Sequence, residues 1–407
     1  MANFAYVAKG PDGKKTEGMI RASDKNAATA ELKKKSLTVS SISEQKDGKK
    51  KGYGIFGPPR PHVKTKDIAV LTRQLSTMIS AGIPLLESLE ILHEQAADPG
   101  FKIVLDKVIE RVRSGSDFST ALSEHGKIFT RIYVNMIKAG EASGQLDVIL
   151  QRLADYMENI EELKREIKAA MTYPVISLFL ILAITVGLIV GIVPKFQEIF
   201  KQLEMKQLPL PTEILLMVSD TLRNNFLAVI GVAIVLIIGF IMYIKTKVGM
   251  KQWHWFCLHA PVFGQLFRKV AISRFSRTFS TLISSGVPML GALDIVASTA
   301  GNIWVEEAVI RAKEAVSRGE TLGDPLAASR VFPPMVTRMV SIGEKTGALE
   351  KLLMKISEFY DSEVRATVKS LTSLIEPLLI ATMGIIVGFI VLAIFLPIIK
   401  IQQSLSK

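Results

Sequence analysis

Three long stretches of the 407-residue chain contain no charged side chain. They cover residues 169–194, 224–244 and 377–399. Each is as long as, or longer than, the roughly 20 apolar residues that a helix needs to cross about 30 Å of hydrocarbon. A buried helix of a globular domain rarely stays uncharged on every face over such a length. The pattern therefore predicts three transmembrane helices.

Basic side chains beside these stretches predict their orientation, because Lys and Arg concentrate on the cytoplasmic side of a membrane. One basic cluster at 164–168 precedes the first stretch, and another at 245–251 follows the second. We therefore expect residues 1–168 and 245–376 in the cytoplasm. The connector at 195–223 and the tail at 400–407 are then expected outside it. Prolines in QLPLPTE, within that connector, predict an irregular loop.

The two predicted cytoplasmic parts share one pattern, which indicates an internal repeat. RQLSTMISAGIPLLESLEIL (73–92) matches RTFSTLISSGVPMLGALDIV (277–296), and a single residue drops out of the second copy further on. The register continues into the first and third apolar stretches, where Pro174 pairs with Pro377. Each copy is thus a cytoplasmic module followed by an outgoing span. Two such copies need a return crossing between them, and the second stretch supplies it.

Apolar residues recur at helical spacing within each copy. Gly82 with Pro84, and Gly286 with Pro288, predict tight corners between helices. The glycine suits a left-handed residue after one helix, and the proline suits the first turn of the next. Further helices are expected at 101–114, 130–139 and 145–168. Residues 66–168 and 245–376 are each predicted to form an all-α bundle, with about six helices in each copy.

The first 45 residues have a different pattern. FAYVA and LTVSSI predict strands, and ASDKNAATAELKKK between them predicts a helix. Residues 1–45 are therefore expected to form a small α+β element. Residues 46–65 lack periodicity and predict a linker, whose Lys46, Lys49, Lys50 and Lys51 are either solvated or in contact with anionic lipid. The chain as a whole is predicted to be a mainly α integral membrane protein.

A second repeated motif, G-E-x-[ST]-G-x-L, has the spacing of a corner between two helices. Its central residues are Gly140, Glu141 and Gly144 in the first copy and Gly343, Glu344 and Gly347 in the second. The first glycine is expected to end a helix, and Ser143 or Thr346 to cap the next one by accepting a backbone N–H. Three roles stay open for the two glutamates: binding neighbouring backbone N–H groups, meeting a partner's Arg or Lys, or helping to hold a cation.

No motif for catalysis accompanies this architecture. The net charge of +12 with a positive mean hydropathy of +0.32 indicates a membrane protein rather than a nucleic-acid binder. There is no nucleotide-binding glycine loop, no histidine in a metal-binding motif, and no catalytic setting for Cys257. The first residues lack an apolar signal segment, so no secretory signal peptide is expected. We expect no enzyme activity, no cofactor and no metal.

The apolar stretches contain no ionisable side chain, which argues against a transporter or channel. They do contain Gly187-x-x-x-Gly191 and Gly384-x-x-x-Gly388, a spacing that lets helices approach closely. The partner of these glycines is another span of this chain, a second copy of the chain, or a helix of another protein.

The combination of motifs resembles the type II secretion F / type IV pilus PilC family of inner-membrane platform proteins. The resemblance rests on the doubled S-x-G-[IV]-P-[LM]-L, on FPPMV (332–336), on the two G-E corners and on IEPLLI (375–380). It covers nearly the whole chain. The segment in which P-x-F-G-x-L leads into R-F-S-R-T is similar to the pilus branch, and the secretion branch is the alternative.

This resemblance implies a mechanical role. Family members lie in the bacterial inner membrane, and their cytoplasmic domains contact a hexameric secretion-type ATPase. Movement of that ATPase is thought to lift pilin or pseudopilin subunits from the bilayer into a fibre, together with other inner-membrane assembly proteins. By this resemblance we expect a multi-pass, non-catalytic homo-oligomer, a dimer being favoured, with a cytoplasmic N-terminus and a periplasmic C-terminus.

Overall fold

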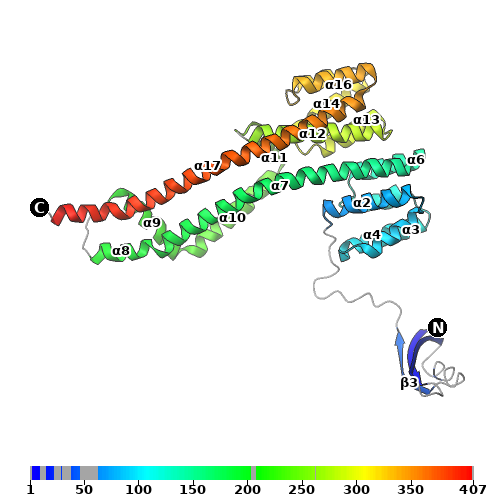
Figure 1. The fold of residues 1–407 in the computed structure, drawn as a ribbon, viewed down its shortest axis with the longest axis horizontal. Helices are drawn as coiled ribbons and strands as arrows, with labels where there is room; N and C mark the ends of the chain where they lie inside the picture. Colours follow the sequence, from blue (N-terminus) through cyan, green and yellow to red (C-terminus); the bar gives the residue numbers. More distant parts are fainter. Residues whose placement is uncertain are drawn as a thin grey trace. The chain divides into compact units, whose positions relative to one another are not determined.

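The computed structural model describes residues 2–9, 15–22, 29, 38–45, 63–202, 208–261 and 263–405 (Figure 1). The chain divides into two compact units, Met1–His62 and Val63–Lys407. Each unit is described by itself.

The N-terminal unit contains a three-stranded antiparallel sheet. Its strands are β1 (Ala2–Lys9), β2 (Lys15–Ala22) and β3 (Thr38–Gln45), in the order β2-β1-β3. The strands predicted at FAYVA and LTVSSI are confirmed. Strand β2 was not predicted, because KTEGMIRA has adjacent rather than alternating apolar residues. The predicted helix is described only at Thr29, and linker residues 46–62, with their four lysines, lie outside the described residues.

The larger unit contains two bundles of six helices each, which agrees with the predicted repeat. The first copy has α2 (Thr65–Ser80), α3 (Leu85–Gln95), α4 (Pro99–Arg113), α5 (Phe118–Ser123), α6 (Arg131–Ser143) and α7 (Leu146–Gly191). The second copy has α12 (Phe263–Ser284), α13 (Met289–Thr299), α14 (Ile303–Ser317), α15 (Gly323–Ala328), α16 (Pro334–Thr346) and α17 (Leu349–Leu405). Helices α8 (Val193–Gln202), α9 (Leu210–Asn224), α10 (Phe226–Lys245) and α11 (Lys247–His259) connect the two copies.

Each bundle is held by apolar side chains from every helix of its copy. In the first copy, the side chains of Leu75, Leu105 and Met136 are at most 1% exposed. In the second copy, Phe275 and Val309 are fully buried. Burying each such side chain contributes roughly 1.5–3 kcal/mol. The apolar residues that recur at helix spacing in the sequence therefore form the core, and the buried residues of both copies belong to one apolar cluster.

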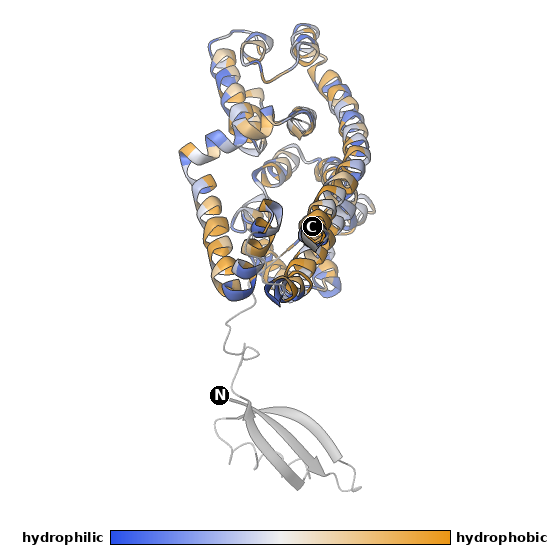
Figure 2. Ribbon diagram, turned by 90° about the vertical axis from the view of Figure 1, so that its left-hand side faces the viewer, coloured by the Kyte–Doolittle hydropathy of each residue, from blue (hydrophilic) through white to orange (hydrophobic). Residues whose placement is uncertain are grey.

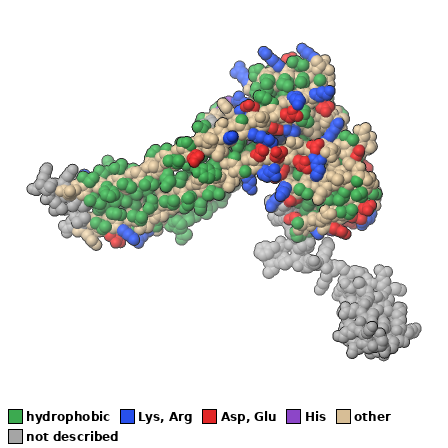
Figure 3. Space-filling view, viewed as in Figure 1, with side chains coloured by type: hydrophobic (Ala, Val, Ile, Leu, Met, Phe, Trp, Pro, Cys, Tyr) green, Lys and Arg blue, Asp and Glu red, His purple; other side chains and the backbone are tan. Residues whose placement is uncertain are grey.

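Helices α7 and α17 each run without a break from a bundle into an apolar segment (Figures 1 and 2). They have 46 and 57 residues and continue through Pro174 and Pro377. Together with α10 they are long and apolar enough to cross a membrane. Figure 3 shows hydrophobic side chains covering these segments, whereas charged side chains gather over the bundles. The last bundle helix and the span predicted after it are thus one helix in each copy.

The prediction of an irregular connector at 195–223 is wrong. Its described residues form α8 and α9, with Pro209 as the N-cap of α9 and Pro211 in its first turn, a position that proline favours. The prolines begin a helix rather than prevent one. Helix α17 also extends through most of the predicted tail, to Leu405.

Helix α9 packs against both α7 and α17 through apolar side chains, and its hydroxyls bind carbonyls of both helices. Pro397 has no N–H for the carbonyl four residues before it, and the Thr212 hydroxyl donates to that oxygen, on Ala393, at 2.5 Å. The Ser219 hydroxyl donates at 2.7 Å to the carbonyl of Ile189, in the last turn of α7. Both bonds lie beside an apolar cluster formed by Val193, Leu215 and Ile390, among others.

Candidate functional site

The corners after α2 and α12 have the geometry that the sequence predicts for their glycines. Gly82 and Gly286 have φ of +84° and +80°. At the first corner Gly82 N–H donates to Ile79 O at 2.9 Å, and the next amide donates to Met78 O at 3.0 Å. This pair of bonds satisfies carbonyls at the helix end. Pro84 and Pro288 are the N-caps of α3 and α13, one position before the expected first turn.

The G-E motif also forms a corner in both copies, but the corner lies later in the sequence than predicted. Helices α6 and α16 continue past Gly140 and Gly343 and end at Ser143 and Thr346. The turn is made by the following glycines, Gly144 and Gly347, with φ of 67° and 69°.

The predicted capping role of Ser143 and Thr346 is wrong. Their hydroxyls donate to the carbonyls of Ala139 and Ile342, each at 2.8 Å and one helical turn back. A serine or threonine in the last turn of a helix has this carbonyl within reach, and the amides of the next helix lie beyond it.

Gly140 and Gly343 lie in close contact with the start of the next helix instead. A Cβ on Gly140 would lie 3.1 Å from Ile149 Cβ, and one on Gly343 would lie 2.8 Å from Leu349 Cα. Separations below about 3.0 Å are not tolerated without a backbone shift. The glycines let the end of one helix touch the start of the next.

The two glutamates bind backbone N–H groups on a preceding short helix. The Glu141 carboxylate accepts from Ser119 N–H at 3.2 and 3.3 Å, at the start of α5. The Glu344 carboxylate accepts from Leu322 N–H at 2.9 and 2.8 Å, at the start of α15. Helix N-termini leave such donors unpaired, and negative charge is favoured there. The partner amide lies 22 residues earlier in both copies, so the sequence motif alone did not reveal it.

Glu141 also faces a surface hollow of about 460 Å³. The hollow is lined by Asp117, Ser119, Lys138 and neighbouring residues of α5 and α6. Glu141 thus accepts a hydrogen bond within its own bundle and also forms part of a polar surface. Among the described residues, no group of three or more His, Cys, Asp and Glu has the arrangement of a metal site.

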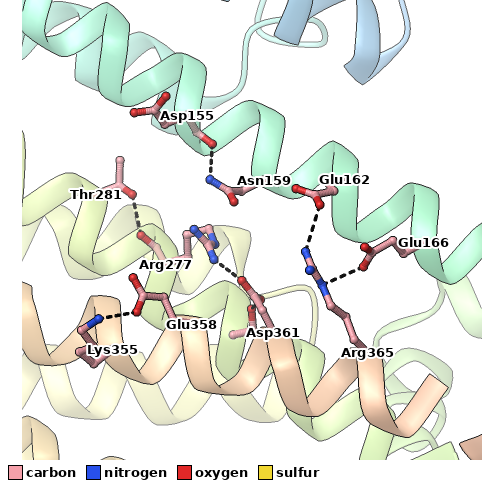
Figure 4. A network of polar contacts seen from close by, with 11 residues as sticks. Asp155, Asn159, Glu162, Glu166, Arg277, Thr281, Lys355, Glu358, Asp361 and Arg365 are labelled. Carbon is pink, nitrogen blue, oxygen red and sulfur yellow. Dashed lines mark hydrogen bonds and ion pairs between the residues drawn. The ribbon is translucent and has the colours of Figure 1, made fainter. Parts of the chain in front are cut away.

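Ion pairs at equivalent positions join each long helix to the first helix of its own bundle. Arg73 of α2 binds Asp155 at 2.5 Å and Glu158 at 2.6 Å on α7. Arg277 of α12 binds Asp361 of α17, which is the counterpart of Glu158 in the repeat (Figure 4). The hydrogen bond with Glu158 is the main reason that the pKa of Arg73 is raised, and the same bond lowers the pKa of Glu158. Sequence spacing did not single out these pairs, because their partners lie more than 80 residues apart.

Comparison with known proteins shows the family to which this chain belongs. A family model described as "Type II secretion system (T2SS), protein F" matches residues 71–194 and again 275–397. The N-terminal domain of the same family matches residues 1–43. The chain belongs to the type II secretion system protein F family. The two matched ranges contain both copies of the module and both outgoing helices, so the predicted repeat is a property of this family.

Full-length relatives carry names from both branches of the family. The chain is 44% identical to "Type IV pilus assembly protein PilC" of Thermus thermophilus over 408 residues, covering 100% of each chain. It is 41% identical to the protein of that name from Myxococcus xanthus, covering 100% of this chain and 96% of the relative. It is 32% identical to "Type II secretion system protein F" of Vibrio cholerae, again over 100% of each chain.

The transmembrane glycines of this family member do not pack against the described part of its own chain. A Cβ added at Gly187, Gly191, Gly384 or Gly388 would meet no atom within 4 Å. The described structure therefore gives no support to packing of these glycines against another span of the same chain.

Proposed function

We propose that this chain is the non-catalytic inner-membrane platform of a type IV pilus assembly machine. In this role it couples a cytoplasmic hexameric ATPase to the insertion of pilin into the fibre or its removal. The observation that carries the proposal is full-length identity of 41–44% to relatives named for pilus assembly, against 32% to the secretion relative. The described structure supports a mechanical role through two bundles joined to spans by unbroken helices.

The orientation that we propose follows the basic flanks of the spans. Lys168 precedes the first apolar segment, and Lys245 and Lys247 follow the second. Both bundles then face the cytoplasm, where an ATPase can reach them, and helix α9 lies on the periplasmic side. Cysteine labelling of Ser43→Cys and Ser404→Cys in a Cys257→Ser background tests this orientation. A membrane-impermeant reagent should label only the second site in intact cells.

Force would pass along α7 and α17. At about 1.5 Å per residue these helices are about 70 and 85 Å long. The Arg73 and Arg277 ion pairs hold each long helix to its bundle. A displacement of one bundle by the ATPase is then transmitted to the span that begins in the same helix.

The hollow beside Glu141 is our candidate ATPase contact on the first bundle. Its Lys138 is exposed, and so is Lys127, which does not line the hollow. With the full-length protein in nanodiscs, Lys138→Glu should weaken binding of the ATPase from the same operon and its effect on ATP hydrolysis, whereas Lys127→Glu should not. If the ATPase neither binds the wild type nor changes its hydrolysis rate, the coupling role is wrong.

The glycine-bearing spans are our candidate contact for pilin. Gly187→Leu and Gly388→Leu should then block piliation while the protein still accumulates in the membrane. Gly231→Leu is the matched control, because Gly231 also meets no neighbour but lies on α10, outside the repeated spans. Normal fibres from both test variants would exclude pilin contact at these positions, and light scattering of each purified variant checks whether a dimer is lost instead.

Protein secretion is the alternative function, supported by the secretion relatives that align over the full chain. Deletion of the gene distinguishes the two. We expect loss of surface fibres with normal levels of secreted proteins. Loss of secreted proteins with fibres intact would assign the chain to a secretion system.

A further inference from the structure

A cavity of about 350 Å³ lies between α7 of the first copy and α12 of the second. At one end the hydroxyls of Tyr156 and Thr278 are 3.2 Å apart. Towards the other end Ile167 and Val270 pack against one apolar cluster. The two helices are therefore antiparallel along the cavity, and the Ile167 end is the end nearer the apolar segment of α7. The volume is that of a small-molecule site.

One wall of the cavity is an apolar stripe. It consists of Ile160, Leu163, Ile167 and Met171 on α7, with Val270 on α12 opposite. The four α7 residues are three or four positions apart, so they lie on one face of the helix. All are only half-buried, which leaves apolar surface for a ligand to cover.

The other lining residues include four cations and no carboxylate. They are Lys164, Lys168, Arg274 and Arg277. Arg277 is neutralised by Asp361, and Lys164 is 4.0 Å from Glu161. Neither Lys168 nor Arg274 has an ion pair with any described residue. The cavity therefore holds uncompensated positive charge beside apolar surface, which suits an anionic amphiphile.

The first copy provides an internal comparison. Lys66, Val70 and Arg73 on α2 correspond in the repeat to Val270, Arg274 and Arg277 on α12, and they also line a hollow. That hollow includes three carboxylates, those of Glu158, Glu161 and Glu162. The same face of the module is thus charge-balanced in one copy and positive in the other.

The cavity lies at the expected boundary of the bilayer. Lys168 is the last charged residue before the apolar segment of α7, and Met171 lies within that segment. Trp255, Phe256 and Phe267, around the start of α12, are exposed aromatic side chains of the kind that favour membrane interfaces. Basic pockets on the cytoplasmic side of membrane helices bind lipid headgroups.

We propose that this cavity binds an anionic phospholipid of the cytoplasmic leaflet. The phosphate is held by Lys168 and Arg274, and an acyl chain runs from there over Ile167 and Met171 towards the apolar segment of α7. A soluble anion would use the cations but leave the stripe exposed to water. The lipid would join α7 to α12, and hence the first copy to the second, independently of which machine the protein serves.

Native mass spectrometry of the full-length protein in detergent, titrated with phosphatidylglycerol or phosphatidylcholine, tests this proposal. The test variant is Lys168→Gln/Arg274→Gln. The matched control, Lys66→Gln/Arg165→Gln, removes two exposed cations that line the hollow beside α2. At about fivefold per cation, we expect the test variant to bind phosphatidylglycerol about 25-fold more weakly than the wild type. The control and the phosphatidylcholine titrations should change little.

Three results would overturn the proposal. Equal wild-type affinity for the two lipids would remove the role of headgroup charge. Equal losses in the test and control variants would indicate general surface attraction. Displacement of phosphatidylglycerol by inorganic phosphate at similar concentration would identify a site for free phosphate, with no part played by the apolar stripe.

Discussion

Glu162 and Arg365 occupy the same position in the two copies of the module, and they bind each other. They are 203 residues apart, which is the spacing of the repeat in this region, and Arg365 donates to Glu162 at 3.2 Å (Figure 4). Arg365 also pairs with Glu166 at 2.9 Å. Helices α7 and α17 therefore meet at equivalent residues. Two identical charges would repel at such a point, so the divergence of this one position makes the two copies complementary.

Reversing one of these charges should weaken the contact between the long helices. Arg365→Glu should lower the free energy of unfolding by about 0.5–1 kcal/mol, because both side chains are about half exposed and such pairs contribute little. Glu162→Arg combined with Arg365→Glu should recover part of the loss, since Glu166 still faces the new carboxylate. Chemical denaturation in detergent measures both, and a double variant no better than the single one would contradict the pairing.

The contacts of Gly343 and Gly140 predict that alanine destabilises the protein by different amounts at the two positions. Gly343→Ala should destabilise the protein by about 1–3 kcal/mol, because its Cβ would lie 2.8 Å from a backbone atom. Gly140→Ala should cost less, since its nearest neighbour would be at 3.1 Å and is a side-chain atom. Gly126→Ala is the control, with only an ordinary contact at 3.7 Å. Thermal unfolding of the three variants gives the order, and equal melting temperatures would contradict it.

Because Glu141 and Glu344 bind backbone N–H groups of their own chain, replacing either one should lower the stability of the protein. Glu344→Ala should cost about 1–3 kcal/mol, because it removes the described acceptor of the Leu322 N–H. Glu141→Ala should cost less, since its bonds are longer. Glutamine at either position keeps one acceptor oxygen and should restore part of the difference. Variants with alanine that fold and assemble pili normally would dismiss both the structural and the partner-binding roles.

His254 predicts a dependence of stability on pH. Its Nδ1 accepts the Ile303 N–H at 3.0 Å, at the start of α14, so the ring must be neutral in the folded protein. Burial lowers its pKa, against a smaller opposite effect of Glu306. The unfolded state then binds the proton more readily, and stability should fall as pH drops below about 6.5. His254→Gln should remove this part of the pH dependence in thermal unfolding from neutral to mildly acidic pH, with His93→Gln as control.

The hydrogen bond of Thr212 predicts a measurable contribution to stability at the end of α17 that is remote from its bundle. Thr212→Val keeps the shape but removes the donor to Ala393 O, beside Pro397. We expect a loss of about 1 kcal/mol. Thr221→Val is the matched control on the same helix, because Thr221 donates only to a carbonyl of its own exposed turn. Similar melting temperatures for the two variants would contradict the role of Thr212.

The sequence predicted most of the fold because the decisive signals are local. The length of the uncharged stretches predicts the spans. Gly82 with Pro84 predicts a corner between helices, and the hydrogen bonds of that corner join residues only a few positions apart. The partners of Glu141 and Arg73 were not predictable in this way, because they lie on other helices. Helix α9 was missed for a different reason: its prolines, read as helix breakers, stand where a helix begins.

Helix α9 has a mechanical consequence for the whole membrane unit. It is bonded to α7 through Ser219 and to α17 through Thr212, at the ends of these helices that are remote from the bundles. The ion pairs of Arg365 with Glu162 and Glu166 join the same two helices nearer the bundles, so α7 and α17 are held together at two levels. A change of angle between them about α9 therefore requires these ion pairs to break, and a movement that keeps the pairs intact shifts both helices together.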